Sequence, residues 1–262
     1  QELVMEISGL AREPVDISRV VMSIKCGASD TTSGMASNCV IGYVADKLVD
    51  LGAAVVFGET TEFLGGEHLL AQRAVTPEVG QNILNIVGRM EQRARSMGCD
   101  MRKGQPTPGN IAGGLSSIEE KSLGAIVKSG TRPIQGVLDY HERMGARKGL
   151  WIKDTPGREP EILTGMAAAG AQFMMFSTGR GAPQGFPTMP VLKVCGNPHT
   201  YQRMEHDMDL NAGRIITGQA SIEQVGEEAF AAILKLLSGR QTKNETLGYH
   251  SSIDIYTMGP VI

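Results

Sequence analysis

The run Lys-Cys-Gly-Ala-Ser-Asp that begins at residue 25 concentrates side chains that can do chemistry. Lys25 and Asp30 could serve as a base and its partner, because an amine and a carboxylate both exchange protons. Cys26 could act as a nucleophile or, through its thiolate, as a metal ligand. Ser29 or Ser33 could bind an anion at the start of a following helix. Since the same residue types also build turns and helix caps, spacing alone leaves a functional and a structural role equally open.

Two further turns carry charged side chains. Glu59 and Glu62 lie three positions apart, and paired carboxylates suit either a divalent cation or general acid–base catalysis. A solvated loop with a helix cap is the alternative explanation for this pair. Arg180 stands between Gly179 and Gly181, where a flexible backbone would let the guanidinium grip a carboxylate substrate in a bidentate manner. A structural salt bridge explains this arginine equally well.

Short apolar runs precede all three turns and predict buried strands at 19–24, 53–57 and 173–176. Apolar residues at helical spacing follow at 35–51 and again at 221–237. Short strands alternating with helices predict an α/β fold, with a mostly parallel sheet and helices on both faces in a Rossmann-like three-layer arrangement. Further strands are predicted at 134–138, 150–152 and 191–194, and further helices at 66–74, 77–97, 116–128, 159–169 and 197–206.

The predicted topology brings the three turns to one edge of the sheet. In a parallel sheet, every turn that follows a strand emerges at the carboxyl edge, and such sheets bind their ligands there. Side chains of residues 25–34, 58–62 and 177–181 can therefore converge although they are far apart in the sequence. This shared position predicts a site at the carboxyl edge.

Length, charge and cysteine usage exclude several classes of protein. The 262 residues suit one α/β domain spanning 1–262, and neither a repeat nor a linker divides it. A net charge of −3 gives no reason to expect nucleic acid or a membrane as a partner. The four cysteines form no Cys-x-x-Cys pair, which argues against a zinc ribbon or a thioredoxin-type site. With no signal peptide and no apolar stretch of membrane-spanning length, a cytoplasmic location is expected.

The start of the chain has apolar residues at helical spacing without a start methionine or a capping residue. This pattern predicts that roughly the first 18 residues are the end of a preceding helix and a linker. The chain is therefore expected to be a fragment of a longer protein.

Two later segments resemble binding motifs only in part. Residues 98–116 show no regular period and predict a long loop that is either functional or disordered. Their glycine-rich part superficially resembles a phosphate loop but lacks its Gly-Lys-Ser/Thr ending and follows no strand. Asp207 and Asp209 resemble a metal-binding carboxylate pair, or they simply precede a turn.

Motifs occur in one order along nearly the whole chain: Lys25–Asp30, Ser33-Gly34, Glu59–Glu62, Gln105–Asn110, Gly113-Gly114, Glu119–Lys121, Asp154–Gly157, Thr178–Gly181, Asp207–Asp209, Ala212-Gly213, Ser238-Gly239 and Thr242–Glu245. In this order they resemble the C-terminal domain of the altronate/galactarate dehydratase family of sugar-acid dehydratases. A chance match does not explain so many motifs that occur in the same order.

The resemblance implies a hydro-lyase that removes water from an aldonic or aldaric acid of the altronate or galactarate class, leaving a 2-keto-3-deoxy sugar acid. It also implies a divalent metal, which we expect to be iron(II), with manganese(II) as the alternative. Cys26, Glu59 and Glu62 are the candidate metal ligands, and a thiolate would favour iron or zinc over magnesium. The expected partners are the sugar acid and the N-terminal domains that full-length relatives carry. The oligomeric state, including a homo-oligomer, stays open.

Within the matched motifs, the resemblance also implies roles for other residues. Lys25 or Asp30 is the candidate base for the C2 proton, Ser29 belongs to the same catalytic set, and Arg180 is the carboxylate clamp. A glutamate left over from metal binding could protonate the leaving hydroxyl. The expected substrate-binding residues are Ser33, Thr178, Gly179, Asn110 and Lys121.

Two alternatives and one departure accompany this interpretation. A related branch removes sulfite from sulfolactate by similar carbanion chemistry, and a non-catalytic domain for binding or oligomerisation is the alternative from another class. His68 is a further candidate ligand, in a segment where the branches differ. The first motif of the family usually has a second glycine where this chain has Ala28. We expect that exchange to be tolerated only if the backbone φ of Ala28 is below zero.

Overall fold

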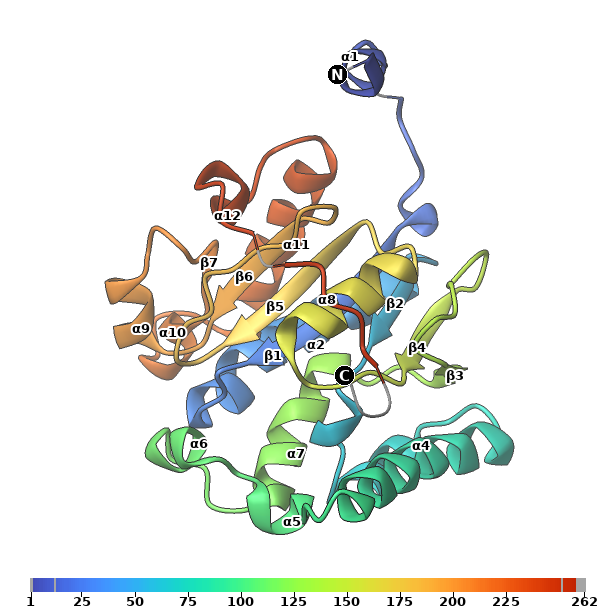
Figure 1. Ribbon diagram of the computed structural model, residues 1–262. Coiled ribbons are helices and arrows are strands. Elements are labelled where there is room, and N and C mark those ends of the chain that lie inside the picture. The colour runs from blue at the N-terminus through green and yellow to red at the C-terminus, as the bar shows by residue number, and fades with distance from the viewer. Residues whose placement is uncertain (1, 12, 251, 258–262) are drawn as a thin grey trace.

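The computed structural model describes residues 2–11, 13–250 and 252–257. These residues form a seven-stranded sheet in the order β3-β4-β2-β1-β5-β6-β7, and all its strand pairs are parallel (Figure 1). The predicted α/β class with a mostly parallel sheet is confirmed. The strands are β1 (Val21–Gly27), β2 (Ala54–Phe57), β3 (Ile134–Leu138), β4 (Gly149–Lys153), β5 (Phe173–Thr178), β6 (Val191–Cys195) and β7 (Leu210–Asn211).

Helices cover both faces of the sheet (Figure 1). On one face α2 (Asn38–Asp50) and α11 (Ile222–Leu237) share an apolar core with Ile24 of β1. On the other face α8 (Glu159–Ala168) packs in a second core with Val21. Because successive strand residues point to opposite faces, one short apolar strand supplies both cores. Burial on both faces is what an all-parallel sheet requires.

Further helices and short helical turns join these layers. Among the described residues, no helix has both the length and the apolar character needed to cross a membrane. α1 stands away from the sheet (Figure 1). The remaining helices are α1 (Glu2–Ser8), α3 (Glu67–Gln72), α4 (Pro77–Ser96), α5 (Met101–Gly104), α6 (Pro108–Ala112), α7 (Ile118–Ile126), α9 (Pro198–Arg203), α10 (Gly213–Ile216) and α12 (Lys243–Thr246), with short turns η1 (Ile17–Arg19), η2 (Ser33–Ser37), η3 (Thr60–Glu62) and η4 (Val127–Ser129).

Strands β1 and β5 run farther than the sequence predicts, to Gly27 and Thr178. Lys25 and Cys26 therefore lie on β1 and not in the turn after it. In the register of the sheet, Lys25 pairs with Phe176 on β5. As consecutive strand residues, Lys25 and Cys26 leave β1 on opposite faces. Glu59 nevertheless bonds to the amine of Lys25 and to the backbone N–H of Cys26.

The predicted long loop at 98–116 contains the helices α5 and α6. The side chain of Thr107 caps α6, and the side chain of Asn110 accepts a hydrogen bond from the backbone N–H of Thr107, which completes a capping box. Helices this short have no apolar period to detect, so the prediction of a plain loop was wrong. The two-residue strand β7 escapes prediction for the same reason.

Ala28 and Glu59 are the non-glycine residues with positive φ in the described part of the chain, at +50° and +69°. The chain therefore accommodates alanine here at a positive φ, and the expectation that this exchange requires a φ below zero is wrong. The backbone carbonyl of Ala28 accepts hydrogen bonds from the N–H groups of Arg180 at 3.0 Å and Gly179 at 3.4 Å. These bonds tie the first turn to the third and hold Ala28 in a conformation that costs about 1–2 kcal/mol outside glycine.

Replacing Ala28 with glycine is expected to raise the free energy of unfolding by about 0.5–1 kcal/mol. Glycine relieves the left-handed strain, but it also gives the unfolded chain more freedom, so the gain is smaller than the strain itself. Urea unfolding measures the difference. The matched control is Ala231→Gly at an exposed position inside α11, where the same change should destabilise by about 1 kcal/mol. If both variants lose stability equally, Ala28 stores no strain.

Candidate active site

A buried ion pair between the adjacent strands β1 and β2 forms the centre of the candidate site. Lys25 Nζ lies 2.9 Å from Glu59 Oε1, and each side chain is 1% exposed. The other oxygen, Glu59 Oε2, accepts a hydrogen bond from the backbone N–H of Cys26 at 2.8 Å. Both oxygens of this carboxylate are therefore held at the carboxyl end of β1.

The turn after β2 is shaped to present Glu59. The N–H of Glu59 donates to Thr155 Oγ1 at 2.7 Å, and Thr60 Oγ1 donates to Asp154 Oδ1 at 2.7 Å. A β-carbon at Gly58 would lie 2.3 Å from the same Thr155 Oγ1, so this position needs glycine. The loop after β4 thus holds the backbone of Glu59 in its left-handed conformation, which directs the Glu59 side chain toward β1. Strained backbone of this kind is common where a side chain must be aimed.

Lys128 completes the cluster and is absent from the residues that the sequence predicts for the site. Its Nζ lies 2.9 Å from Cys26 Sγ, 2.5 Å from Glu59 Oε2 and 3.1 Å from Glu62 Oε2, and its side chain is fully buried. It belongs to η4, directly after α7. A single lysine at the end of a predicted helix carries no local signal, so only the fold identifies it.

The structure brings together all three predicted metal ligands. Cys26, Glu59 and Glu62 each offer one ligand atom, and these atoms lie within 4.8 Å of one another. The Cys26 thiol donates a hydrogen bond to Glu62 Oε2 at 2.9 Å. A thiol and two carboxylates suit a cation such as iron(II), zinc or manganese. The ammonium of Lys128 already bonds to all three residues, so the donor set fits a cation at its centre.

Burial and neighbouring charges set the protonation states in this cluster. Burial alone would lower the pKa of Lys25 and Lys128. Glu59 above all raises the pKa of Lys25, and Cys26, followed by Glu59 and Glu62, raises that of Lys128 strongly. Burial and the charge of Glu62 raise the pKa of Cys26 well above its usual value, so Cys26 stays a thiol. Burial opposes ionisation of Glu62, yet Lys128 and then Lys121 lower its pKa to about 2. Two carboxylates, two ammonium groups and one neutral thiol therefore meet here.

Asp30 organises the first turn. Its Oδ1 accepts hydrogen bonds from Thr32 Oγ1 at 2.6 Å and from the Ser33 N–H at 3.0 Å and Oγ at 3.2 Å. Its Oδ2 accepts one hydrogen bond, from Asn197 Nδ2 at 3.0 Å. A β-carbon at Gly179 would lie 1.9 Å from Oδ1, so the third turn must approach with glycine. Asp30 therefore joins the turns after β1, β5 and β6.

A small cavity lies between Asp30 and Lys121. It measures about 20 Å³, and Ser29, Asp30, Ser33 and Lys121 are among the residues that line it. Lys121 Nζ donates to Gln105 Oε1 at 2.6 Å and lies 3.9 Å from Glu62 Oε1. Lys121 therefore stands between the predicted base and the predicted metal ligands.

The other predicted substrate-binding residues are engaged in building the turns. Thr178 Oγ1 accepts a hydrogen bond from the N–H of Gly181 at 3.0 Å. Asn110 donates from Nδ2 to the carbonyl of Ser29 at 3.0 Å, besides its capping role in α6. Arg180 is exposed, and a β-carbon on Gly109 would lie 2.3 Å from its guanidinium. Of this group, Arg180 is the side chain that can reach a substrate in solution.

A second feature that the sequence does not reveal lies behind Lys25. Lys25 and Lys193 both contact the ring of Phe176, with Nζ 4.9 Å and 3.7 Å from its centroid. Lys193 is fully buried, and its Nζ has no hydrogen-bond partner among the described residues. Burial, and then the charge of Lys25, lower the pKa of Lys193 to about 7. The strand register explains why these three side chains lie side by side, because Lys25 pairs with Phe176 across β1 and β5, and Phe176 pairs with Lys193 across β5 and β6.

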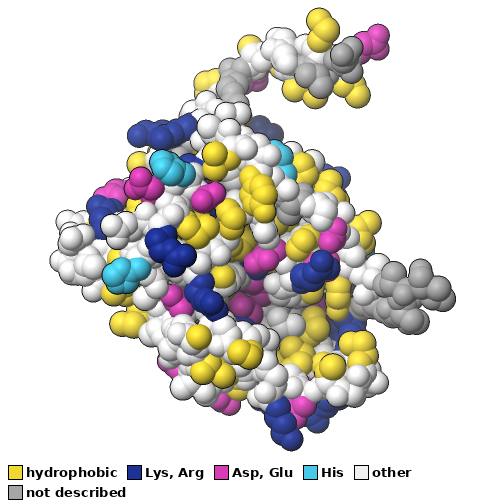
Figure 2. All heavy atoms as spheres, turned by 60° about the vertical axis from the view of Figure 1, so that its left-hand side comes forward, with side chains coloured by type: hydrophobic (Ala, Val, Ile, Leu, Met, Phe, Trp, Pro, Cys, Tyr) yellow, Lys and Arg dark blue, Asp and Glu magenta, His cyan; other side chains and the backbone are white. Residues whose placement is uncertain are grey.

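The face of the molecule in Figure 2 includes the side of Figure 1 toward which the ends of β1 and β5 point. It shows a hollow in which acidic side chains lie recessed beside lysine and arginine side chains.

His68 is exposed on α3 and lies outside the cluster of potential metal ligands found among the described residues.

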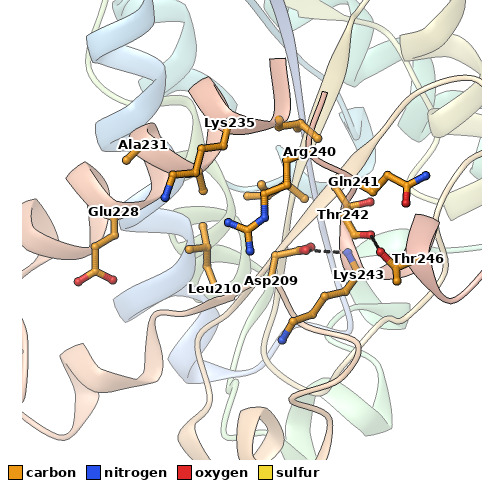
Figure 3. Close-up of a pocket in the computed structure, with 13 residues that line it drawn as sticks. Asp209, Leu210, Glu228, Ala231, Lys235, Arg240, Gln241, Thr242, Lys243 and Thr246 are labelled. Carbon is orange, nitrogen blue, oxygen red and sulfur yellow. Dashed lines mark hydrogen bonds between the residues drawn. The ribbon is translucent and has the colours of Figure 1, made fainter. Parts of the chain in front are cut away.

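The pocket in Figure 3 lies at another part of the sheet, against β6, β7, α11 and α12, with a volume of about 610 Å³. Asp209 accepts hydrogen bonds there from the backbone N–H groups of Lys243 at 2.9 Å and Lys193 at 2.7 Å. These bonds favour the structural explanation of the Asp207–Asp209 pair. Lys235 and Arg240 line the same pocket. The cluster of potential metal ligands found among the described residues lies at the carboxyl edge and not in this pocket.

Comparison with known proteins places the chain in a family. Residues 17–261 match the family model described as D-galactarate/Altronate dehydratase, C-terminal. The chain is 38% identical over 97% of its length to the (2R)-sulfolactate sulfo-lyase subunit beta of Chromohalobacter salexigens, and covers 65% of that protein. It is 38% identical over 95% of its length to the galactarate dehydratase (L-threo-forming) of Escherichia coli, and covers 48% of it. The altronate dehydratase of Bacillus subtilis is 35% identical over 90% of the chain, which covers 47% of that enzyme.

The chain thus spans from about half to about two thirds of the length of these relatives. The match extends from η1 to beyond the last described residue, so it includes the buried cluster at the carboxyl edge and every strand of the sheet. The resemblance that the ordered motifs indicate is confirmed: the chain belongs to the D-galactarate/altronate dehydratase family, as its C-terminal domain.

Proposed function

We propose that this chain is the lyase domain of an enzyme that removes water from an aldonic or aldaric acid of the altronate or galactarate class. The product is a 2-keto-3-deoxy sugar acid. The observation that carries the proposal is the buried cluster of Lys25, Cys26, Glu59, Glu62 and Lys128 at the carboxyl edge. Such a cluster concentrates charge where a negatively charged intermediate needs it. The family relatives named as galactarate and altronate dehydratases support the same chemistry.

The reaction balances without a redox partner. A base takes the C2 proton, the electron pair forms the C2–C3 double bond, and the C3 hydroxyl leaves after it receives a proton as water. The resulting enol then takes up a proton at C3, loses the proton of its 2-hydroxyl group and becomes the 2-keto acid. The protein must therefore supply one proton acceptor, positive charge beside the enediolate and one proton donor.

The structure favours different residues for these three tasks. Lys25 carries a raised pKa and is an ammonium group, so it suits stabilisation of the enediolate better than proton abstraction. Asp30 retains the role of base in our proposal, because Oδ2 has a single hydrogen-bond donor. Lys121, at the edge of the same small cavity, is placed to donate the proton to the leaving hydroxyl, and Arg180 is the carboxylate clamp.

A divalent metal, iron(II) or manganese(II), is part of the proposal, with Cys26, Glu59 and Glu62 as its ligands. When bound, such an ion would neutralise charge that develops on the carboxylate and the 2-hydroxyl of the substrate. A reducing, cytoplasmic location agrees with the four cysteines, all of which are free thiols.

The experiment is a substrate panel of altronate, galactarate and sulfolactate, assayed with the intact protein and iron(II) by the appearance of a 2-keto acid or sulfite. Turnover of altronate or galactarate is the expected result. The Arg180→Ala variant should then raise KM about tenfold or more, since a bidentate contact to a carboxylate is lost. Failure of all three substrates would leave the non-catalytic alternative.

A sulfo-lyase activity is the second candidate. It rests on the relative named as a sulfolactate sulfo-lyase subunit, which matches 97% of this chain at 38% identity. Release of sulfite from sulfolactate without turnover of either sugar acid would decide for it. Since that relative is named as a subunit, this candidate also predicts a separate partner chain in the active assembly.

A further inference from the structure

The feature that remains unexplained by the proposed function is the position of Lys128. A lysine used only to balance charge could approach one carboxylate from one side. Lys128 Nζ instead touches one atom from each of three residues, at 2.9 Å from Cys26 Sγ, 2.5 Å from Glu59 Oε2 and 3.1 Å from Glu62 Oε2. These are the same residues whose donor atoms gather within 4.8 Å of one another.

We infer that Lys128 and the divalent metal compete for one place, so that the metal binds only when the Lys128 ammonium leaves its three partners. The inference rests on the metal requirement in the proposed function. In this view the Lys128 ammonium occupies the position of the ion and must move away before the ion binds.

Distances alone make joint occupancy unfavourable. A metal bonded to Glu59 Oε2 would lie about 2.0–2.2 Å from that oxygen. Lys128 Nζ lies 2.5 Å from the same oxygen. The two cations would then be less than about 5 Å apart even if they approached the oxygen from opposite sides, with little water to screen their repulsion.

The charge balance supports the same conclusion. The carboxylates of Glu59 and Glu62 carry two negative charges, and the ammonium groups of Lys25 and Lys128 balance them in a place that excludes water. A divalent ion added to this neutral set would leave uncompensated positive charge in a buried site. If Lys128 withdraws and Cys26 binds as a thiolate, the charges balance again.

Lys121 provides a matched comparison. It lies 3.9 Å from Glu62 Oε1, has a side chain that is 13% exposed and donates a hydrogen bond to Gln105. Its replacement also removes one positive charge beside Glu62, from a greater distance than that of Lys128. It does not vacate the space between the three donors. The two lysines therefore separate competition for a place from a general effect of positive charge.

The test is a cobalt(II) titration of the intact protein and of its Lys128→Met and Lys121→Met variants, read by the absorption of thiolate-bound cobalt. We expect Lys128→Met to bind cobalt at least tenfold more tightly than the wild type. The Lys121→Met variant should stay within about threefold of the wild type, because Lys121 does not occupy the space between the three donors and lies farther from Glu62 than Lys128 does. Adding Cys26→Ala to Lys128→Met should abolish the thiolate absorption. Equal or weaker cobalt binding by Lys128→Met overturns the inference.

A structure of the wild-type protein grown with cobalt provides a measurement that does not depend on how the variant folds. Cobalt bonded to Cys26, Glu59 and Glu62 with Lys128 Nζ withdrawn supports the inference. Cobalt on the same three residues with Lys128 Nζ still in hydrogen-bond contact overturns it. Both measurements are independent of turnover. If no substrate of the panel reacts while Lys128→Met gains cobalt, the proposed function fails and the competition stands.

Discussion

Replacing Glu59 with glutamine is expected to lower the free energy of unfolding by about 3–5 kcal/mol, because it breaks buried ion pairs on one side only. Glu59 lies between two buried ammonium groups, with Lys25 Nζ at 2.9 Å and Lys128 Nζ at 2.5 Å. Glutamine removes the negative charge and places an NH₂ donor against a lysine or against the N–H of Cys26. At least one buried donor then has no acceptor, which adds to the loss of charge pairing.

The measurement is urea unfolding at neutral pH, with Glu227→Gln as the matched control. Glu227 also accepts from a lysine, Lys47, at 2.5 Å, but its side chain is 53% exposed. Its replacement should cost less than about 1 kcal/mol, as for other exposed ion pairs. A Glu59→Gln variant within about 1 kcal/mol of the wild type would mean that Glu59 does not hold the two lysines, and that breaking a buried ion pair costs little in this cluster. Loss of dehydratase turnover in the same variant is expected in addition.

Replacing Lys193 with methionine should stabilise the protein by about 2–4 kcal/mol at neutral pH. The Lys193 side chain is fully buried, lacks a hydrogen-bond partner in the described part of the chain and has a pKa lowered to about 7. In the unfolded chain a lysine has a pKa of about 10.4. Unfolding therefore takes up a proton at any pH between these values, and that uptake favours the unfolded state.

The sign of the pH dependence follows. Between about pH 7 and pH 10 the unfolded state binds more protons at this residue, so the contribution of Lys193 to stability rises by up to about 1.4 kcal/mol per pH unit. Below about pH 7 lysine is protonated in both states, and the destabilisation is complete and constant. The advantage of Lys193→Met should therefore be largest near pH 7 and shrink toward pH 10.

Unfolding free energies of the two proteins at three pH values across this window test the prediction. Lys235→Met is the matched control, because Lys235 is exposed on α11 and its loss should change stability by no more than about 0.5 kcal/mol at any of them. An advantage of Lys193→Met that is the same at all three pH values would mean that Lys193 is charged and paired in the folded protein.

The class of fold, and the convergence of three candidate ligands at one edge of the sheet, could be predicted from the sequence alone. The β-branched and apolar runs predicted β3 at its observed bounds, and the capped amphipathic run at 221–237 predicted α11 to within one residue. These features are local, since strand and helix periods repeat within a few residues. Once the strands are parallel, their carboxyl ends must share an edge, so Cys26, Glu59 and Glu62 could be expected to meet.

Only the tertiary structure decided which side chains complete that site and in which charge state. Lys128 lies 102 positions from Cys26, yet its Nζ contacts the Cys26 thiol at 2.9 Å. Lys193 joins Lys25 only through the order of β1, β5 and β6. The Ala28 backbone adopts a positive φ because two hydrogen bonds from the third turn hold it there. Burial and charge pairing depend on neighbours brought in from distant segments, and a residue's own sequence context does not contain them.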